Sequence, residues 1–138
     1  MKYIGFLFHI YQPPTQEPWI VRKIVDESYS PLTRTIRDFP NLRFIMNINL
    51  SLVEHLDKFA PEVLANICAA HAQGNLELTG SGAYHPIFPL IPRREVIRQL
   101  ELNEQGIRRL LTDEFQPRGV AGDGLRVSVG TAVRRTGL

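Results

Sequence analysis

Three short apolar segments, separated by stretches with helical spacing, are the feature that most constrains how this chain can fold. Residues 3–10 (YIGFLFHI) are continuously apolar and stop before Pro13 and Pro14, which predicts a strand buried on both faces. Residues 42–48 (LRFIMNI) and 75–79 (NLELT) have the length and apolar content of two further strands. Strands that alternate with helices favour βα units, so we predict an α/β fold with a parallel sheet.

Helix signals lie between and after these segments. Ser30 and Pro31 have the arrangement of an N-cap followed by a first-turn proline, and Ser51 has the spacing of a capping box. Gly74 is well placed to end the helix that precedes the third strand. Apolar residues recur at helical spacing over 93–113, which predicts one long amphipathic helix there.

Length and composition limit the class of protein. The chain has 138 residues, whereas a closed eight-fold α/β barrel usually needs about 250 residues. No apolar run approaches the roughly 20 residues of a membrane span, and the N-terminus lacks the small-residue cleavage site of a signal peptide. The single cysteine, Cys68, excludes a disulfide within the chain. We therefore expect a cytoplasmic protein that does not contact a membrane.

Charge is distributed unevenly along the chain. Residues 1–115 hold 12 Lys and Arg against 13 Asp and Glu, whereas residues 116–138 hold four Arg against Asp123. The last 20 residues also contain five glycines and no aromatic residue. A nucleic-acid surface needs clustered basic residues and usually aromatic platforms, so we expect no nucleic-acid binding. Residues 118–138 are predicted to be a disordered tail.

Polar side chains stand at the ends of two predicted strands, where parallel α/β folds bind their ligands. His9 and Gln12 belong to the end of the first strand, and Glu77 and His85 belong to the third strand and the loop that follows it. Imidazole, amide and carboxylate groups beside aromatic rings suit a sugar, because sugar hydroxyls need hydrogen-bond partners. Two simpler readings stay open, since His9 also fits a core histidine and Glu77 fits a solvent-facing strand position.

Other side chains have structural explanations. His55 and His71 fall on predicted helices and are expected at the surface, and Cys68 lies on an apolar helix face and is expected to pack in the core. The chain contains no glycine-rich phosphate loop and no GxSxG motif. A zinc site built from His9, Glu77 and His85 has no known metal-motif spacing. We therefore expect neither a cofactor nor a metal ion.

Four motifs follow one another along the chain: FHIYQPP (8–14), ESYSPL (27–32), NLRFIMNINLSLVEHL (41–56) and GNLELTGSGAYHPIFPLIP (74–92). Together they resemble the N-terminal part of the catalytic domain of glycoside hydrolase family 57. The resemblance implies the first βα units of an incomplete seven-fold β/α barrel. It also implies activity on α-glucans, of the amylase, branching enzyme or 4-α-glucanotransferase type. Such enzymes retain the anomeric configuration of the sugar and use two carboxylates.

The resemblance also assigns residues. By their place in the motifs, His9, Gln12, Glu77 and His85 correspond to positions that bind the sugar, and none of them corresponds to the nucleophile or to the acid/base carboxylate. The resemblance therefore implies an α-glucan as the partner of the intact parent enzyme. A chain without both catalytic carboxylates is expected to be inactive alone.

The departure from the family begins after Val120. Family members continue there into Trp-Leu-Pro-Glu-Met-Ala, which contains the nucleophilic glutamate, whereas residues 121–125 read AGDGL. One set of codons for AGDGL spells Pro-Glu-Met-Ala when it is read one base later. This observation predicts that residues 1–117 form the family-like domain and that residues 118–138 are an aberrant tail, out of frame from about Val120 onward.

One alternative to a fragment of an enzyme stays open. A small, non-catalytic carbohydrate-binding or interaction module would also contain these polar and aromatic residues. A three-stranded slice of a barrel exposes a sheet edge, so self-association through that edge is expected of the enzyme fragment.

Overall fold

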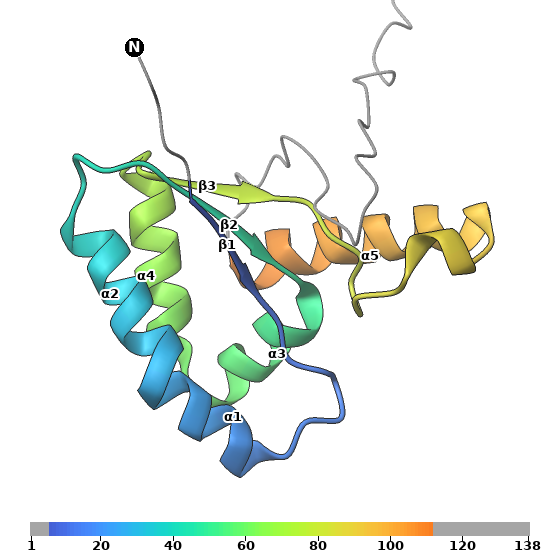
Figure 1. Ribbon diagram of the computed structural model, residues 1–138, viewed down its shortest axis with the longest axis horizontal. Helices are drawn as coiled ribbons and strands as arrows, with labels where there is room; N and C mark the ends of the chain where they lie inside the picture. The colour runs from blue at the N-terminus through green and yellow to red at the C-terminus, as the bar shows by residue number, and fades with distance from the viewer. Residues whose placement is uncertain (1–5, 112–138) are drawn as a thin grey trace, which may run out of the picture.

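The computed structural model describes residues 6–111, which form a three-stranded parallel sheet with helices packed on one face (Figure 1). This arrangement confirms the predicted α/β fold with a parallel sheet. The elements follow one another in the order β1 (Leu7–Ile10), α1 (Pro18–Ile24), the π-helical turn η1 (Val25–Tyr29), α2 (Ser30–Asp38), β2 (Phe44–Ile48), α3 (Leu50–Phe59), α4 (Pro61–Ala72), β3 (Leu76–Thr79), the 3-10 turn η2 (Phe88–Leu90) and α5 (Arg93–Leu110).

The sheet has the order β1-β2-β3, and its parallel register aligns side chains in rows across the strands. Residues of alternate positions, such as Met46, Ile48 and Leu78, face the helices and are buried in the core. The opposite face is partly open in the described residues: Leu7 is 51% exposed, whereas Asn47 on the same face is buried. The prediction that the first strand is buried on both faces is therefore wrong for this structure.

The first helical segment begins earlier than the sequence predicts. Pro18 opens α1, and the chain continues through the π-helical turn into α2 without a break. Ser30 has helical backbone angles and makes no capping bond, so the predicted N-cap at Ser30 is wrong. The wide turn lies just before Pro31, whose missing N–H and bulky ring interrupt a regular α-helical ladder.

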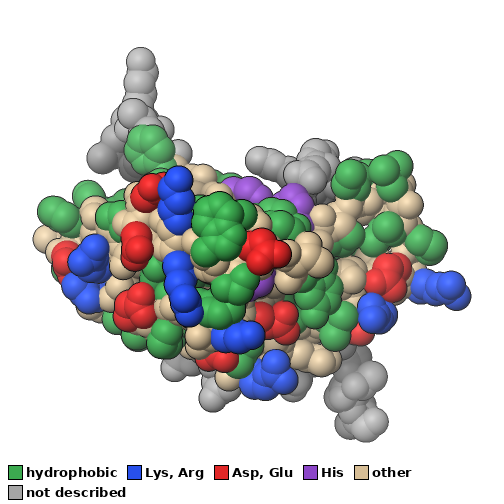
Figure 2. Space-filling view, turned by 90° about the horizontal axis from the view of Figure 1, so that it is seen from below, with side chains coloured by type: hydrophobic (Ala, Val, Ile, Leu, Met, Phe, Trp, Pro, Cys, Tyr) green, Lys and Arg blue, Asp and Glu red, His purple; other side chains and the backbone are tan. Residues whose placement is uncertain are grey.

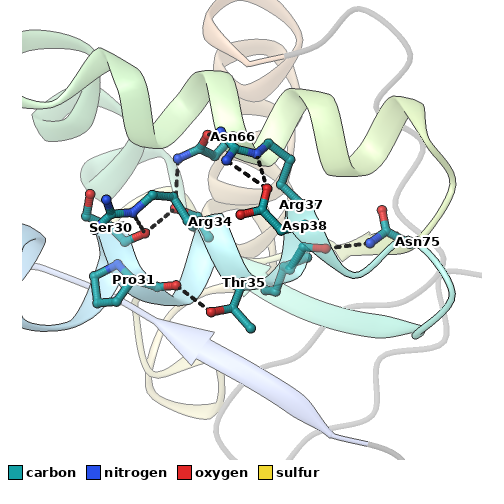
Figure 3. A network of polar contacts seen from close by, with 10 residues as sticks. Ser30, Pro31, Arg34, Thr35, Arg37, Asp38, Asn66 and Asn75 are labelled. Atoms are coloured by element: carbon teal, nitrogen blue, oxygen red, sulfur yellow. Dashed lines mark hydrogen bonds and ion pairs between the residues drawn. The ribbon is translucent and has the colours of Figure 1, made fainter.

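Polar contacts join α2 to α4 and to the turn before β3 (Figure 3). Arg37 donates from Nη1 to Oδ1 of Asn66 on α4 at 2.7 Å, and it also pairs with Asp38. Asn75 donates from Nδ2 to the carbonyl of Ile36 at 2.6 Å. The end of α2 is thereby held to both α4 and the start of β3.

The third helix starts at a different cap from the one expected. The side chain of Asn49, and not that of Ser51, accepts a hydrogen bond from the backbone N–H of Leu52. Ser51 instead donates from its hydroxyl to the carbonyl of Gln12 at 2.7 Å, which ties α3 to the loop after β1. The predicted stop at Gly74 is confirmed, because this residue has a φ of 76° at the end of α4.

The long helix α5 is confirmed over Arg93–Leu110, and it packs against α3. Asn103 accepts from the backbone N–H of Leu50 at 2.8 Å, so it satisfies a donor in the first turn of α3. None of the helices in residues 6–111 is long and apolar enough to cross a membrane. On the face shown in Figure 2, acidic and basic side chains are interspersed with hydrophobic ones. The predicted tail, residues 118–138, lies outside the described residues.

The contact between α5 and α3 predicts a large effect of Gly106→Ala. A β-carbon at Gly106 would lie 2.7 Å from Cδ2 and 2.9 Å from Cγ of Leu50. Overpacking of this kind costs about 1–3 kcal/mol, so we expect the free energy of unfolding in urea to fall by that amount. Gln105→Ala, at the exposed neighbouring position, is the matched control and should leave the unfolding midpoint nearly unchanged. Equal midpoints for the two variants would contradict the packing argument.

Candidate functional site

Two of the sequence-predicted site residues meet at the carboxyl end of the sheet. His9 on β1 and His85 in the loop after β3 have their Nε2 atoms 3.1 Å apart, although 76 residues separate them in the sequence. Their ring centroids are 5.0 Å apart, and the ring of Tyr11 stacks on that of His85 at 4.4 Å. The structure therefore forms a cluster of two imidazoles and a phenol on one side of the sheet.

The loop that carries His85 is held in place by backbone and side-chain contacts. Gln99 on α5 accepts two hydrogen bonds from it, one from Ala83 N–H to the carbonyl of Gln99 and one from Tyr84 N–H to its Oε1. A β-carbon at Gly82 would lie 2.5 Å from Cδ of Pro86, so the loop closes only around glycine. His85 itself has a φ of 54°, a left-handed conformation that costs a non-glycine residue free energy.

Asn47 on β2 contacts His9 and the end of β3, and sequence reasoning missed it. Its side chain is 1% exposed, and its amide lies 2.7 Å from Nδ1 of His9 and 3.0 Å from the hydroxyl of Thr79. The parallel register places His9, Asn47 and Thr79 in a single row, one from each strand. A polar residue within the apolar segment FIMNI was the available signal, because buried amides need partners.

Glu77 lies on the same open face of the sheet as His9. The register places it beside Ile45, one row nearer the amino ends of the strands than Thr79. The carboxylate is exposed, so the solvent-facing arrangement left open by the sequence is the one observed in the described residues. Glu77 is also the one carboxylate among the residues of the three described strands.

Gln12 lies behind the histidine pair rather than within it. Its side chain is 8% exposed, and its amide donates from Nε2 to the hydroxyl of Tyr29 at 3.0 Å and accepts from Gln16 at 2.9 Å. Tyr29 in turn donates to the carbonyl of Tyr11. Gln12 therefore holds the backbone that carries Tyr11, and it does so through the buried hydroxyl of Tyr29.

The other singled-out side chains have structural partners. His55 and His71 are half-buried, so both remain partly at the surface as predicted, and each also contacts a backbone carbonyl, Pro13 at 2.9 Å and Leu76 at 3.0 Å. Cys68 packs against the core as predicted, and burial raises the pKa of its thiol. Within residues 6–111, no group of three or more His, Cys, Asp and Glu side chains is arranged to hold a metal ion.

A separate hollow of about 320 Å³ lies between the loop after β1 and α3. Pro14, Gln16, His55 and Phe59 are among its lining residues, and neither His9 nor His85 contributes to it. His9 is exposed, so the histidine pair lies on the sheet face and apart from this hollow.

Comparison with known proteins decides the family. The sequence profile of Glycosyl hydrolase family 57 matches residues 6–129. The chain belongs to glycosyl hydrolase family 57. This finding confirms the resemblance carried by the four motifs, and the matched range includes every residue of the candidate site.

Individual family 57 relatives agree with this assignment. The chain is 30% identical to an alpha-amylase of Pyrococcus horikoshii over 112 residues, which is 80% of this chain and 18% of the relative. It is 28% identical to a 4-alpha-glucanotransferase of Thermococcus kodakarensis over 122 residues, which is 87% of this chain and 18% of that protein. The chain thus spans about 18% of the length of these curated relatives.

Two solved family 57 structures share the fold. The 4-alpha-glucanotransferase from Thermococcus litoralis superposes with a TM-score of 0.76 at 24% identity, over 84% of this chain and 18% of that one. The branching enzyme of Thermococcus kodakaraensis, solved in complex with glucose, gives a TM-score of 0.70 at 17% identity, over 86% of this chain and 32% of that one. The three-stranded parallel sheet therefore corresponds to part of a family 57 barrel.

The position of Tyr29 predicts how stability depends on alkaline pH. Burial raises the pKa of Tyr29 above its usual value of 10.0, while the hydrogen bond from Gln12 lowers it to a smaller extent. Because the unfolded chain loses this proton first, the contribution to stability is full below pH 10 and declines as the pH rises above that value.

As the pH rises from about 9.5 to 11, we expect the thermal unfolding midpoint of Tyr29→Phe to fall less than that of the wild type. Tyr84→Phe, at an exposed tyrosine, is the control for the removal of a phenol hydroxyl. Parallel pH profiles for the wild type and Tyr29→Phe would show that this buried phenol does not contribute.

Proposed function

We propose that this chain is part of a retaining, α-glucan-active glycoside hydrolase or transglycosidase, of the amylase, branching enzyme or 4-α-glucanotransferase type. The observation that carries the proposal is the His9–His85 pair with Tyr11 at the carboxyl end of a family 57 sheet. The relatives that cover most of this chain are named alpha-amylase and 4-alpha-glucanotransferase, which supports the substrate class.

The chemistry of the cluster suits a sugar ring. An imidazole offers one donor and one acceptor to hydroxyl groups, and the Glu77 carboxylate on the same face accepts from two hydroxyls at once. Tyr11 offers an aromatic surface against which the apolar face of a pyranose packs. We assign sugar contact to His9, Glu77 and His85, and we assign Gln12 to the same site through its support of Tyr11.

Catalysis needs more than this cluster provides. Retaining glycosidases use two carboxyl groups about 5–5.5 Å apart, one as nucleophile and one as acid/base. Glu77 is a single carboxylate on the open face of the described strands, and a single carboxylate cannot fill both roles. We therefore assign this chain to sugar binding and expect it to release no reducing sugar from amylose by itself.

The binding role predicts a weak but specific contact with maltoheptaose. Saturation-transfer difference NMR on the full chain should detect the sugar, and His9→Ala and Glu77→Ala should each reduce the signal several-fold, because each removes a partner of a hydroxyl group. Glu62→Gln, which neutralises an exposed carboxylate on α4, is the charge-matched control and should bind like the wild type. Equal signals from all four proteins would overturn the assignment.

A non-catalytic carbohydrate-binding module is the alternative, and the same sample distinguishes it. Such a module would be a compact monomer that binds the sugar with one-to-one stoichiometry. A fragment of a barrel would instead bind the sugar poorly. It would also self-associate, since Phe6 and Leu7 are exposed beside the edge of β1 that has no partner strand in the described residues. Sedimentation and titration calorimetry separate these two outcomes.

The proposal that residues after Val120 are out of frame predicts a result at the DNA level. Sequencing of the gene across the codons of Arg118 to Leu125 should show a frame, one base away, that encodes Pro-Glu-Met-Ala. That frame would restore the glutamate that serves as nucleophile in the family. A gene whose codons do not contain this sequence in any frame would overturn the frameshift, while the sugar-binding assignment would still be judged by the NMR experiment.

A further inference from the structure

The orientation of the Asn47 side chain is fixed by its contacts. Its Nδ2 lies 3.2 Å from the carbonyl oxygen of Gly80, which accepts hydrogen bonds but cannot donate them. The amide nitrogen, and not the amide oxygen, must therefore face Gly80. A second bond from Nδ2 to the hydroxyl of Thr79 at 3.0 Å uses the other hydrogen of the amide. The oxygen Oδ1 is consequently the atom that faces His9.

This orientation determines where His9 carries its proton. Oδ1 of Asn47 lies 2.7 Å from Nδ1 of His9, and because a carbonyl oxygen only accepts, Nδ1 must carry the hydrogen. In the neutral imidazole, Nε2 of His9 is then without a hydrogen and acts as an acceptor. Nε2 of His85, at 3.1 Å, must be the donor in the contact between the two rings. One hydrogen-bonded chain thus runs from Gly80 and Thr79 through Asn47 to His85.

We propose that Asn47 is a positioning residue that holds His9 in the Nδ1–H tautomer, so that Nε2 of His9 accepts a hydrogen bond from a sugar hydroxyl. In the structure described here this acceptor is occupied by the N–H of His85. The part of the inference that concerns the sugar rests on the proposed function, whereas the part that concerns the tautomer does not.

Burial makes the Asn47 contact strong enough for this role. Asn47 is 1% exposed, so water does not compete for Oδ1, and leaving this buried polar group unpaired would be unfavourable. The opposite tautomer of His9 would place two acceptors, Oδ1 and the bare Nδ1, against each other at 2.7 Å. The donor contacts to Thr79 and Gly80 prevent the amide from turning over to relieve that clash.

The tautomer is measured directly on the full chain. Long-range proton–nitrogen correlation spectra of ¹⁵N-histidine-labelled protein at about pH 8, where an unperturbed imidazole is neutral, distinguish the protonated from the bare ring nitrogen. We expect Nδ1 of His9 to carry the hydrogen in the wild type, with the His9→Gln spectrum used to assign the signals. A wild-type spectrum with the hydrogen on Nε2 of His9 would overturn the proposal without the need for any Asn47 variant.

Two substitutions separate positioning from general structural support. Asn47→Leu removes the acceptor and should shift His9 toward the Nε2–H tautomer. Asn47→Asp keeps an acceptor facing Nδ1 and should retain the wild-type tautomer, even though it loses the two donor contacts. Asn66→Leu is the control, since it removes a buried amide that contacts α2 and not His9. A wild-type tautomer in Asn47→Leu would contradict the proposal.

The role of Asn47 in sugar binding is tested with the maltoheptaose NMR signal on the same proteins. We expect a several-fold loss in Asn47→Leu and recovery in Asn47→Asp. If the tautomers behave as stated but the wild type binds no sugar, the proposed function fails and the assignment of Asn47 as the residue that sets the tautomer stands. If the wild type binds sugar and Asn47→Leu binds it equally well, the role of Asn47 in sugar binding is overturned.

Discussion

The parallel register of the three strands is the constraint on which the candidate site depends. It places His9, Asn47 and Thr79 in one row, so a side chain from each strand reaches its neighbour without any help from a loop. A shift of one residue in β2 would replace Asn47 with an apolar side chain that belongs to the core. The burial of Met46 and Ile48 on the helix side therefore fixes the polar row on the open side.

Buried polar side chains also fix the loops that carry the other site residues. Ser51 and Gln99 are both nearly inaccessible to solvent, and each binds backbone of a loop that carries a site residue. Because α3 and α5 supply these two residues and also pack on each other, the loops after β1 and β3 are positioned by the same pair of helices. The geometry of the Tyr11–His85 contact thus depends on the packing of Gly106 against Leu50, far from either ring in the sequence.

The sequence predicted those features that depend on local patterns. The three strands, the stop at Gly74 and the extent of α5 follow from hydrophobic spacing and from the backbone preference of glycine. The starts of α1 and α3 did not follow, because Ser30 and Ser51 have the residue type of a cap, whereas α1 begins at Pro18 and Asn49 caps α3. Tertiary contacts decide between neighbouring candidates of equal local preference.

The site was predictable to the extent that its residues stand at the ends of strands. His9 and His85 could be proposed on that basis, and their contact agrees with it. Asn47 could not, since a single asparagine in an apolar strand has many explanations until its partners are known. The partners of His55 and His71 were unpredictable for the same reason, because each histidine contacts a backbone carbonyl that only the fold brings close.

The partly open sheet face explains how a carboxylate is accommodated at Glu77 in the described residues. The carboxylate lies beside Ile45 and in the same row as Leu7, which are both apolar. Its position carries little free-energy cost as long as water solvates the carboxylate. If that face were covered, a bare carboxylate would be strongly unfavourable unless donors surrounded it. The hydroxyl groups of a bound sugar are donors of this kind, and they would be available only when the ligand is present.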